Sequence, residues 1–358
     1  MSNIMMRQLS SVSILLFAFA SSAPAHDFCV DSSAAIQGAL TAAQSNGEDD
    51  TILIRTGHYL LDTDLSAGLT FSSTEAHSLT LIGGFDDPQC QGAIDLAGPG
   101  SVLDGEVAVR PLIVSNAAGA VSITALTFAN GFVAGTGGGL NVGAGAVTVT
   151  LSRFYLNRAT GANAQGGGLF AVAVAGPVEL HNNLIWYNRA TKVGGAALYQ
   201  ADAVNGDGSV ELNTITANTT DTLAEPGGLR LTGGGAPCAA NFGVDNNIVW
   251  NNHVTGGSDF GVFCPHTRNT NDIGVVTPGS TDIGFTSDLS VDSQFVACGT
   301  CGNLELEWKS PLVDAGTSNV TLHGFDLAGK FRQQGLKVDI GAFENDVIFR
   351  NAFDSNAP

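Results

Sequence analysis

The chain has 358 residues, of which 44% are hydrophobic, 13% are charged and 46 are glycine, and its formal net charge is −19. Such a hydrophobic content excludes a disordered chain, and glycine without a strict three-residue period excludes collagen. Acidic residues outnumber basic ones 33 to 14 and no basic patch is present, so nucleic-acid binding is not expected and polyanionic sugars would be repelled.

The first 25 residues have the pattern of an export signal. Arg7 supplies a positive start, residues 13–20 form an apolar run, and Ala23-Pro24-Ala25 is a small-residue cleavage site. The apolar run is shorter than the roughly 20 residues that span a bilayer, and no later stretch is long enough. We therefore expect a signal peptide over residues 1–25, no transmembrane segment, and a mature chain that is secreted or held at the cell surface.

Residues 33–45 contain the clearest helical pattern, which Asn46-Gly47 ends. Strand patterns follow, separated by Gly-Gly or Asp-Gly turns. They cover residues 51–54, 78–82, 101–103, 112–114 and 121–128. A short helix before the first strand is expected to cap an exposed sheet edge.

A hydrophobic residue, two spacers and an asparagine recur five times between residues 121 and 252, and glycine clusters follow the first four copies. The repeated asparagines are Asn130, Asn157, Asn188, Asn218 and Asn251, which lie 27, 31, 30 and 33 residues apart. A repeat of this length indicates stacked supersecondary units. We expect a solenoid domain over residues 26–344, with caps at both ends.

In stacked coils each residue lies above its equivalent in the next coil. Asparagine side chains can then hydrogen-bond in a ladder, and asparagine also tolerates the left-handed bend between strands. We expect the five asparagines to form this ladder. A second ladder is expected at positions five residues earlier in the chain. The second ladder would contain Asn183, Asn213 and Asn246, while Phe154, Ile185, Ile215 and Ile248 would stack in the core.

After residue 252 the repeat decays. Residues 253–303 are predicted to form long loops, and residues 304–344 are predicted to cap the far end. Residues 345–358 form a separate tail, which is either a sorting segment or a last strand.

Six cysteines remain after the signal, and an even number in an exported chain predicts disulfides. Cys238 and Cys264 are about one repeat apart, which would place them on neighbouring coils within disulfide reach. Cys29 and Cys90 both fall in the N-terminal cap region and are a candidate pair. Cys298 and Cys301 form a C-x-x-C in a turn, which favours a structural disulfide over a redox motif.

The repeat motif, with Phe154 and Asn157 as its best copy, resembles that of polymorphic outer-membrane-protein repeats. Residues 310–316, 326–329 and 338–344 (SPLVDAG, DLAG and VDIGAFE) resemble the C-terminal region of choice-of-anchor Q domain proteins. These resemblances imply a right-handed parallel β-helix with a short N-terminal helical cap and an irregular C-terminal cap. They also imply export with one of the varied C-terminal sorting signals of that family, for which residues 347–354 are a candidate, with a last strand that closes the cap as the alternative.

Parallel β-helices often act on polysaccharides, so we searched for two mechanisms. Hydrolysis needs carboxylates about 5 to 9.5 Å apart. Glu179 and Glu211 follow similar valines in neighbouring coils and are candidates, although exposed strand carboxylates are the simpler interpretation. The adjacent pairs Asp49-Asp50 and Asp86-Asp87 fall near the N-terminal cap.

Elimination needs a base, for which Arg158 and Arg189 are the candidates, because Asn-Arg-Ala-Thr occurs at both positions and would stack the two arginines. Corner arginines that balance a negative surface are the alternative. Ca²⁺ is a cofactor of some such enzymes, and residues 205–208 (NGDG) resemble a fragment of a Ca²⁺ loop, although a turn is the simpler interpretation.

Four further residues were weighed as functional. His181 and His253 lack the spacing of a zinc site and are expected to be exposed. Trp186 and Trp250 sit two and one residues before their repeat asparagines, so a two-residue alternation predicts that only one of them is buried, and an outward tryptophan could stack on a sugar ring.

The sequence therefore predicts a non-catalytic exported surface or extracellular protein that binds glycans or cell-surface partners. A polysaccharide lyase or hydrolase is the alternative hypothesis.

Overall fold

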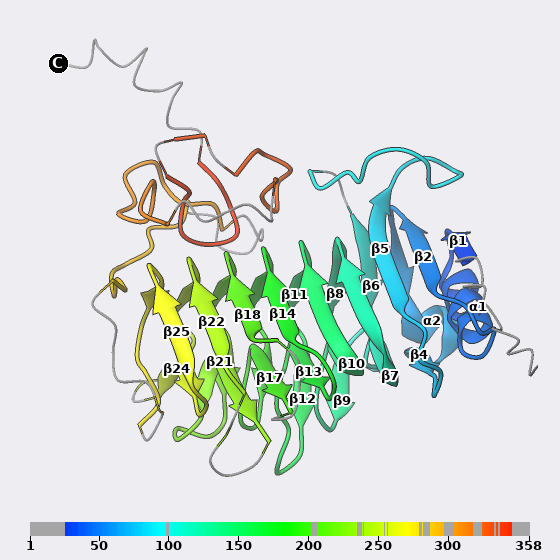
Figure 1. Ribbon diagram of the computed structural model, residues 1–358, viewed down its shortest axis with the longest axis horizontal. Coiled ribbons are helices and arrows are strands. Elements are labelled where there is room, and N and C mark those ends of the chain that lie inside the picture. Colours follow the sequence, from blue (N-terminus) through cyan, green and yellow to red (C-terminus); the bar gives the residue numbers. More distant parts are fainter. Residues whose placement is uncertain are drawn as a thin grey trace, which may run out of the picture.

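A computed structural model describes residues 26–345, except 98–99, 202–205, 235–237, 239, 254, 256, 279–280, 282–286, 297–303, 318–323, 333 and 336. The described chain is a parallel β-solenoid, in which successive coils stack into a rod with three sheets along its length (Figure 1). The predicted fold class is confirmed. The predicted signal peptide, the tail beyond Asn345, and Cys298 and Cys301 lie outside the described residues.

The largest sheet has 14 strands. They are β1 (His26–Val30), β2 (Asp50–Arg55), β4 (Leu69–Ser72), β5 (Leu79–Phe85), β7 (Leu112–Thr124), β10 (Leu140–Thr150), β13 (Leu169–Ala173), β14 (Val178–His181), β17 (Ala196–Gln200), β18 (Gly208–Glu211), β21 (Pro226–Gly233), β22 (Phe242–Asp245), β24 (Ser258–Val262) and β25 (His266–Asn269). Long strands such as β10 pair with two strands of the next coil, because a bend divides that coil into separate strands.

The second sheet has eight strands and the third has four. The second contains β3 (Gly57–Leu60), β6 (Ser101–Asp104), β8 (Leu126–Ala129), β11 (Arg153–Tyr155), β15 (Leu184–Trp186), β19 (Thr214–Thr216), β23 (Ile248–Trp250) and β26 (Asp272–Ile273). The third contains β9 (Phe132–Ala134), β12 (Arg158–Thr160), β16 (Arg189–Ala190) and β20 (Thr219–Thr220).

The core inside the coils is built by equivalent apolar residues that stack from coil to coil. In the second sheet the stack contains Phe128, Phe154, Ile185, Ile215 and Val249, each at most 1% exposed. The rings of Phe128 and Phe154 are parallel with centroids 4.9 Å apart. The prediction was wrong for Ile248, because this residue aligns with Thr214 and packs on the outside of the coil.

The N-terminal end is covered by α1 (Ser33–Ala43) and the short helix α2 (Leu61–Leu65). The Ser32 hydroxyl accepts a hydrogen bond from the Ala35 N–H and so caps the start of α1. Helix α1 buries Ile36, Leu40 and Ala43 against the first coil, which is the covering role that the sequence predicts. In Figure 1 the helices close the blue end of the rod.

Two asparagine ladders run through the coils. The first connects Asn157, Asn188, Asn218 and Asn252, with each Nδ2 donating to the Oδ1 of the next asparagine at 2.8–2.9 Å. The second connects Asn183, Asn213, Asn247 and Asn271 in the same way. All eight side chains are at most 1% exposed.

Three predicted ladder positions were therefore wrong. Asn130, Asn246 and Asn251 have φ values of 50°, 57° and 56° and form the left-handed bends, while the next residue takes the ladder position. The left-handed bend and the ladder require different backbone geometry, so two successive residues divide the roles. At the Asn130 corner that next residue is Gly131, whose N–H donates to Asn157 Oδ1 at 2.8 Å.

Disulfides join Cys29 to Cys90 and Cys238 to Cys264. The first connects β1 to the loop after β5 in the N-terminal cap. The second joins the loops that precede β22 and β25, which are neighbouring strands of the same sheet. Both pairings match the sequence interpretation.

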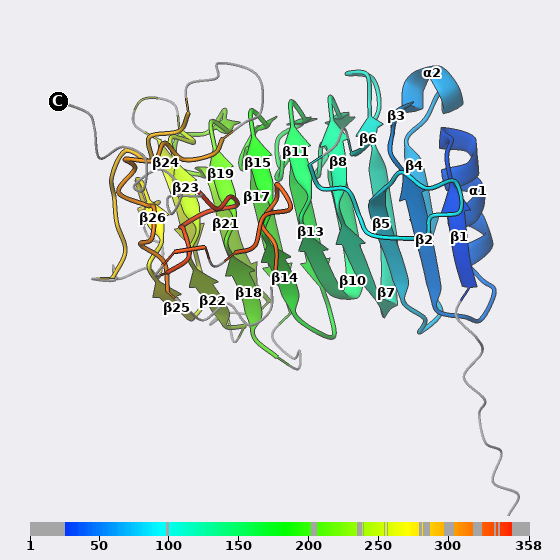
Figure 2. The same ribbon diagram turned by 90° about the horizontal axis from the view of Figure 1, so that it is seen from above.

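The irregular C-terminal cap has two parts. The described residues of 275–295 continue from the last coil through isolated bridges between Phe260 and Val276 and between Asp272 and Leu289. The described residues of 304–345 are called here the C-terminal segment, and residues 304–344 were expected to cap the far end. They instead run back along the side of the solenoid, over β15, β19 and β23 (Figure 2).

Candidate functional site

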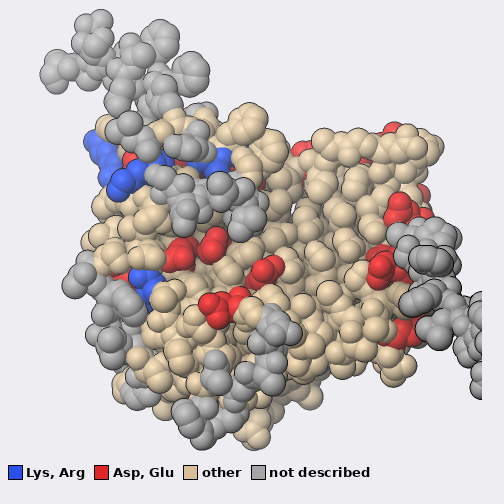
Figure 3. Space-filling view, in the orientation of Figure 1, with Lys and Arg blue, Asp and Glu red and all other residues tan. Residues whose placement is uncertain are grey.

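The outer surface of the large sheet carries a row of carboxylates on three successive coils. Glu179 on β14, Glu211 on β18 and Asp245 on β22 alternate with the buried valines Val178, Val210 and Val244. Because side chains alternate across a strand, the inward valines force these carboxylates outward. We call Glu179, Glu211 and Asp245 the acidic row, and Figure 3 shows acidic side chains gathered on this face.

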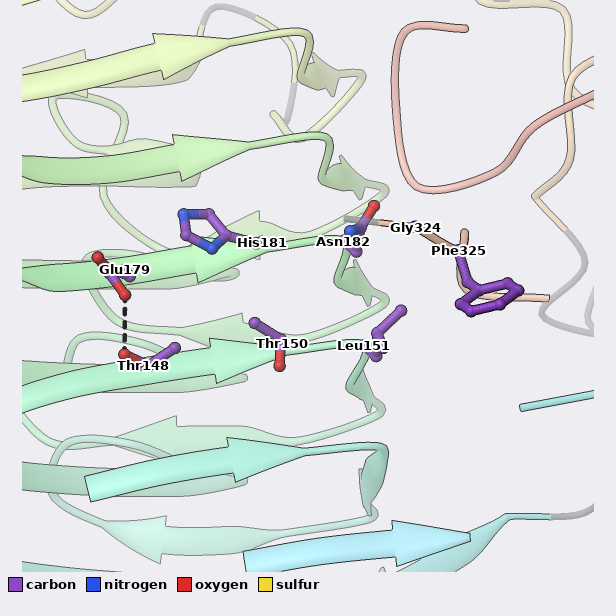
Figure 4. Close-up of a pocket in the computed structure, with 8 residues that line it drawn as sticks. All are labelled: Thr148, Thr150, Leu151, Glu179, His181, Asn182, Gly324 and Phe325. Carbon is purple, nitrogen blue, oxygen red and sulfur yellow. Dashed lines mark hydrogen bonds between the residues drawn. The ribbon is translucent and has the colours of Figure 1, made fainter. Parts of the chain in front are cut away.

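The C-terminal segment overhangs one end of the row and encloses a hollow of about 410 Å³, called here the main pocket. Its lining comes from β10, β14 and the C-terminal segment (Figure 4): Thr148, Thr150, Leu151, Glu179, His181, Asn182, Gly324 and Phe325. Glu179 accepts a hydrogen bond of 2.9 Å from the Thr148 hydroxyl. An aromatic ring, hydroxyls and a carboxylate thus surround one opening.

A smaller hollow of about 130 Å³, the side pocket, lies farther along the row and is lined by Glu211, Asp245, Asn246, Asn269 and Thr317. Glu211 aligns with His181 on one neighbouring strand and with Asp245 on the other. Adjacent strands are about 4.8 Å apart. Both hollows therefore open onto one continuous face of the sheet.

The protonation of this face is set by burial. Burial raises the pKa of Glu211, and the charges of Asp245 and Glu179 raise it further, although the Ser209 hydroxyl opposes this shift. Burial also raises the pKa of Asp245. His181 was expected to be exposed, but it is only 5% exposed, and burial lowers its pKa to about 4, which keeps the imidazole neutral at ordinary pH.

The C-terminal segment is attached to the solenoid by buried polar contacts. Arg332 donates to the Asn182 side chain at the edge of the main pocket, and the Ala342 N–H donates to the Thr214 hydroxyl at 2.9 Å. The Thr317 N–H donates to Asn246 Oδ1 at 2.9 Å beside the side pocket. These contacts hold the walls of both hollows at fixed places along the coils.

Aromatic and aliphatic packing attaches the same segment. Tyr155, Trp186 and Trp250 share one position of the second sheet, with Thr216 between the two tryptophans. Trp186 is 6% exposed and packs against Leu327 and Phe343 of the segment. Trp250 is only partly buried, so only one of the two tryptophans is buried, as expected. The reason for that expectation was wrong, because both tryptophans lie at the same strand position, two residues before the ladder asparagines Asn188 and Asn252.

Arg158 and Arg189 stack in register on β12 and β16 of the third sheet, as the repeated motif predicts. They lie on a different sheet from the acidic row and line neither hollow. Arg189 forms an ion pair of 2.6 Å with Asp221, and both side chains of this pair are about half exposed. The pairing occupies the guanidinium that elimination would need as a base.

His253 lies in a third hollow of about 200 Å³, where its Nδ1 is 3.0 Å from the fully buried Asp259. Asp259 also accepts the Asn252 N–H and therefore ends the first ladder. The contact between His253 and Asp259 is therefore explained by the structural role of Asp259 at the end of the ladder.

The remaining predicted carboxylates serve the N-terminal cap. Asp49 accepts hydrogen bonds from Ser78, and Asp86 accepts one from Thr56. Within the described part of the chain, no group of three or more His, Cys, Asp or Glu side chains is arranged to hold a metal ion. The candidate Ca²⁺ loop begins at Asn205, which lies outside the described residues.

Sequence reasoning missed Asp245 and Phe325. A signal for Asp245 was present, because Val178-Glu179 and Val210-Glu211 are followed one coil later by Val244-Asp245. Phe325 lies on the C-terminal segment and reaches the pocket only through long-range packing, for which no local signal exists.

No protein-family model, curated protein or solved structure gives a significant match to this chain. The resemblance to choice-of-anchor Q proteins therefore stays a prediction from the motifs. What the fold and the site define is a parallel β-solenoid with disulfides and an acidic, partly roofed outer face.

Proposed function

We propose that this protein is an exported, non-catalytic β-solenoid that binds a glycan on the acidic row, beneath the edge of the C-terminal segment. The observation that carries this proposal is the main pocket. The Phe325 ring, the Thr148 hydroxyl and the Glu179 carboxylate all belong to its lining. Sugars present apolar C–H faces and many hydroxyls, and such a combination of groups complements both.

The aromatic side of the site supports this interpretation. Phe325 is 46% exposed and Phe331 is 67% exposed, and their ring centroids are 4.9 Å apart. Adjacent exposed aromatic rings form an apolar patch of the kind that marks binding sites. A rigid rod with a row of polar groups on successive coils suits an extended chain of repeating units.

The proposal is tested by isothermal titration of residues 26–358 with neutral and charged oligosaccharides of equal length. Phe325→Ala is expected to weaken the binding of the best ligand about tenfold or more, since stacking on an aromatic ring is lost. Trp308→Ala is the matched control, because Trp308 is also 46% exposed but lines neither hollow. Equal effects of the two substitutions, or no binding to any oligosaccharide, would reject the site.

Glycoside hydrolysis is a second candidate, favoured by the relationship between Glu211 and Asp245. They align on adjacent strands about 4.8 Å apart, close to the carboxylate separation of retaining glycosidases. Burial raises the pKa of both groups, as a general acid requires. One carboxyl would protonate the glycosidic oxygen while the other attacks the sugar.

The two candidates are separated by product release from polysaccharides, read by mass spectrometry. Hydrolytic products that disappear in both Glu211→Gln and Asp245→Asn would establish hydrolysis. Products that contain an unsaturated sugar would instead indicate elimination, and Arg158→Ala would then be the first variant to test. Binding without products from any substrate leaves the non-catalytic proposal standing.

Export is proposed from the pattern of residues 1–25 and is consistent with the disulfides, because disulfides persist in oxidising compartments. No helix in the described chain is long and apolar enough to cross a membrane. Expression with and without residues 1–25, followed by fractionation, tests the proposal. Retention of the shortened chain in the cytoplasm is the expected result.

A further inference from the structure

The acidic row carries negative charge that its surroundings do not neutralise. No Lys or Arg belongs to the described lining of the main or the side pocket. Arg268, on the next strand, is held by Asp288 at 2.6 Å with both side chains at most 7% exposed. Arg332 is 2% exposed and donates to Asn182 and to the Gly341 carbonyl behind the pocket wall.

The carboxylates also repel one another. The charges of Glu179 and Asp245 both disfavour ionisation of Glu211, and the charge of Asp288 disfavours that of Asp245. Like charges kept on successive coils cost folding free energy unless a ligand compensates them. A cationic ligand would remove this repulsion.

The geometry indicates how the positive charges of that ligand are distributed. Glu211 and Asp245 align on adjacent strands about 4.8 Å apart, whereas Glu179 aligns with Ser209 and so lies diagonal to Glu211, about 7–8 Å from it. One small ion cannot contact all three carboxylates at this separation. A chain that carries several positive groups can place them at the aligned pair Glu211 and Asp245 and at the diagonal Glu179.

A second, independent feature points to a sugar in the main pocket. Asn182 is completely buried and lines the pocket, and no described residue accepts a hydrogen bond from its Nδ2. Its Oδ1 is already used by Arg332. Figure 4 shows Asn182 at the end of β14 beside His181, so a ligand hydroxyl or ring oxygen that entered there would supply the missing acceptor.

We propose that the ligand is a polycationic amino-sugar chain, whose free amines pair with Glu179, Glu211 and Asp245. This inference rests on the proposed glycan binding and specifies its substrate class. The ammonium groups would form charge-assisted hydrogen bonds to the carboxylates, and the Phe325 ring would cover one sugar face. N-acetylation would remove the charge that the acidic row recognises.

The test compares four hexasaccharides at pH 6: fully deacetylated glucosamine hexamer, its N-acetylated form, cellohexaose and hexagalacturonate. We expect the deacetylated hexamer to bind at least tenfold more tightly than the other three in calorimetry at low salt. The preference should fall by about tenfold in the double variant Glu211→Gln/Asp245→Asn. Asp27→Asn, an exposed charge on β1 at the opposite end of the rod, is the matched control and should leave the preference unchanged.

The outcomes distinguish the inference from the proposed function. Equal binding of the deacetylated hexamer and cellohexaose would overturn the amino-sugar assignment and keep glycan binding. Binding that Asp27→Asn weakens as much as the double variant would show attraction to overall charge and would also overturn it. If none of the four hexasaccharides binds to protein with the far-ultraviolet spectrum of folded β-sheet, both proposals fail.

Discussion

The Arg332 guanidinium lies 4.0 Å from a carboxylate oxygen of Glu344, and only 2% and 1% of the two side chains are exposed. Both belong to the C-terminal segment, close to the face that packs on the solenoid. Asp326 and Asp339 lie in the same cluster and are at most 1% exposed. One arginine therefore compensates several buried carboxylates at the place where this segment is attached.

Substitution Arg332→Ala is expected to destabilise the protein by about 3–5 kcal/mol, because it leaves buried charge without a partner. Urea unfolding followed by fluorescence measures the loss. Lys330→Ala removes an ion pair with Glu305 at 3.7 Å, in which both side chains are about one-third exposed, and should cost at most about 1 kcal/mol. Similar losses for the two variants would contradict the structural role of Arg332.

Glu344 predicts a pH dependence of stability. Burial, strengthened by the charge of Asp339, raises the pKa of Glu344 from 4.5 to about 8. Between these values the folded protein holds a proton that the unfolded chain releases, so the unfolding free energy falls as pH rises and the loss is complete above the folded pKa. Burial raises the pKa of Asp339 only to about 6, so its contribution is already lost by pH 7.

We therefore expect the unfolding free energy to fall by a few kcal/mol at most between pH 7 and pH 9. Glu344→Gln should flatten this change, because an amide does not titrate and can still accept the Asp339 N–H. Urea midpoints at pH 7, 8 and 9 for both proteins provide the comparison. An equally steep fall in the variant would assign the titration to another group.

The first asparagine ladder predicts a large difference between two asparagines of the same motif. Asn188 donates to the carbonyls of Phe154 and Trp186 and accepts the Asn157 N–H, all inside the coil. Asn188→Ala leaves several buried groups unpaired and should cost about 3 kcal/mol or more. The measurement is the free energy of unfolding from urea titrations.

Asn251→Ala is the control, since Asn251 is exposed and outside the ladder. Its φ of 56° disfavours alanine, so a loss of about 1 kcal/mol is expected, which Asn251→Gly should recover. A larger loss of unfolding free energy in Asn251→Ala than in Asn188→Ala would instead support the ladder position first expected from the sequence.

The same asparagines explain how far the sequence alone could determine the fold. The repeat length and the stacked apolar residues predict the solenoid, because both are local periodic features. The predicted ladder position was wrong by one residue at Asn246-Asn247 and at Asn251-Asn252. Two asparagines are adjacent at both places, and from the sequence either of them could form the bend or join the ladder. The bend at Leu156, Tyr187 and Ala217 uses residues with no helpful signature.

The candidate site was less predictable than the fold. Alternation places Glu179 and Glu211 on the outside of the sheet, but the pocket exists only because the C-terminal segment returns along the solenoid. That return depends on contacts between residues far apart in sequence, such as Thr214 with Ala342. Such contacts leave no periodic trace in the sequence, and their energy depends on complementary surfaces that only the folded chain brings together.

The two disulfides should stabilise the protein unequally. Cys238 and Cys264 are 26 residues apart, and Cys29 and Cys90 are 61 apart. In the loop-entropy model both replacements by alanine pairs cost about 3–4 kcal/mol, with the larger loss for the longer loop. Denaturant titrations of the two double variants measure these losses. The reverse order would show that local packing outweighs loop length at Cys238 and Cys264.

The hydroxyl of Thr214 provides a way to loosen the C-terminal segment without touching the pocket. It accepts the Ala342 N–H at 2.9 Å, and Thr214 is 1% exposed. Thr214→Val keeps the side-chain shape but leaves that N–H unpaired, which should cost about 1–3 kcal/mol. Hydrogen exchange should then quicken in residues 324–345, while the core strands β11 and β15 keep their protection.

If the segment holds Phe325 over the main pocket, the same variant should also weaken glycan binding severalfold through a less favourable binding entropy, because the ligand must then order the segment. Thr216→Val is the matched control, since Thr216 lies on the same strand and is 4% exposed but accepts no hydrogen bond from the described part of the segment. Faster exchange with unchanged binding would mean that the segment stabilises the rod without shaping the site. Slower release of the ligand in the variant would contradict the positioning role altogether, because a loosened wall cannot retain the sugar better than a fixed one.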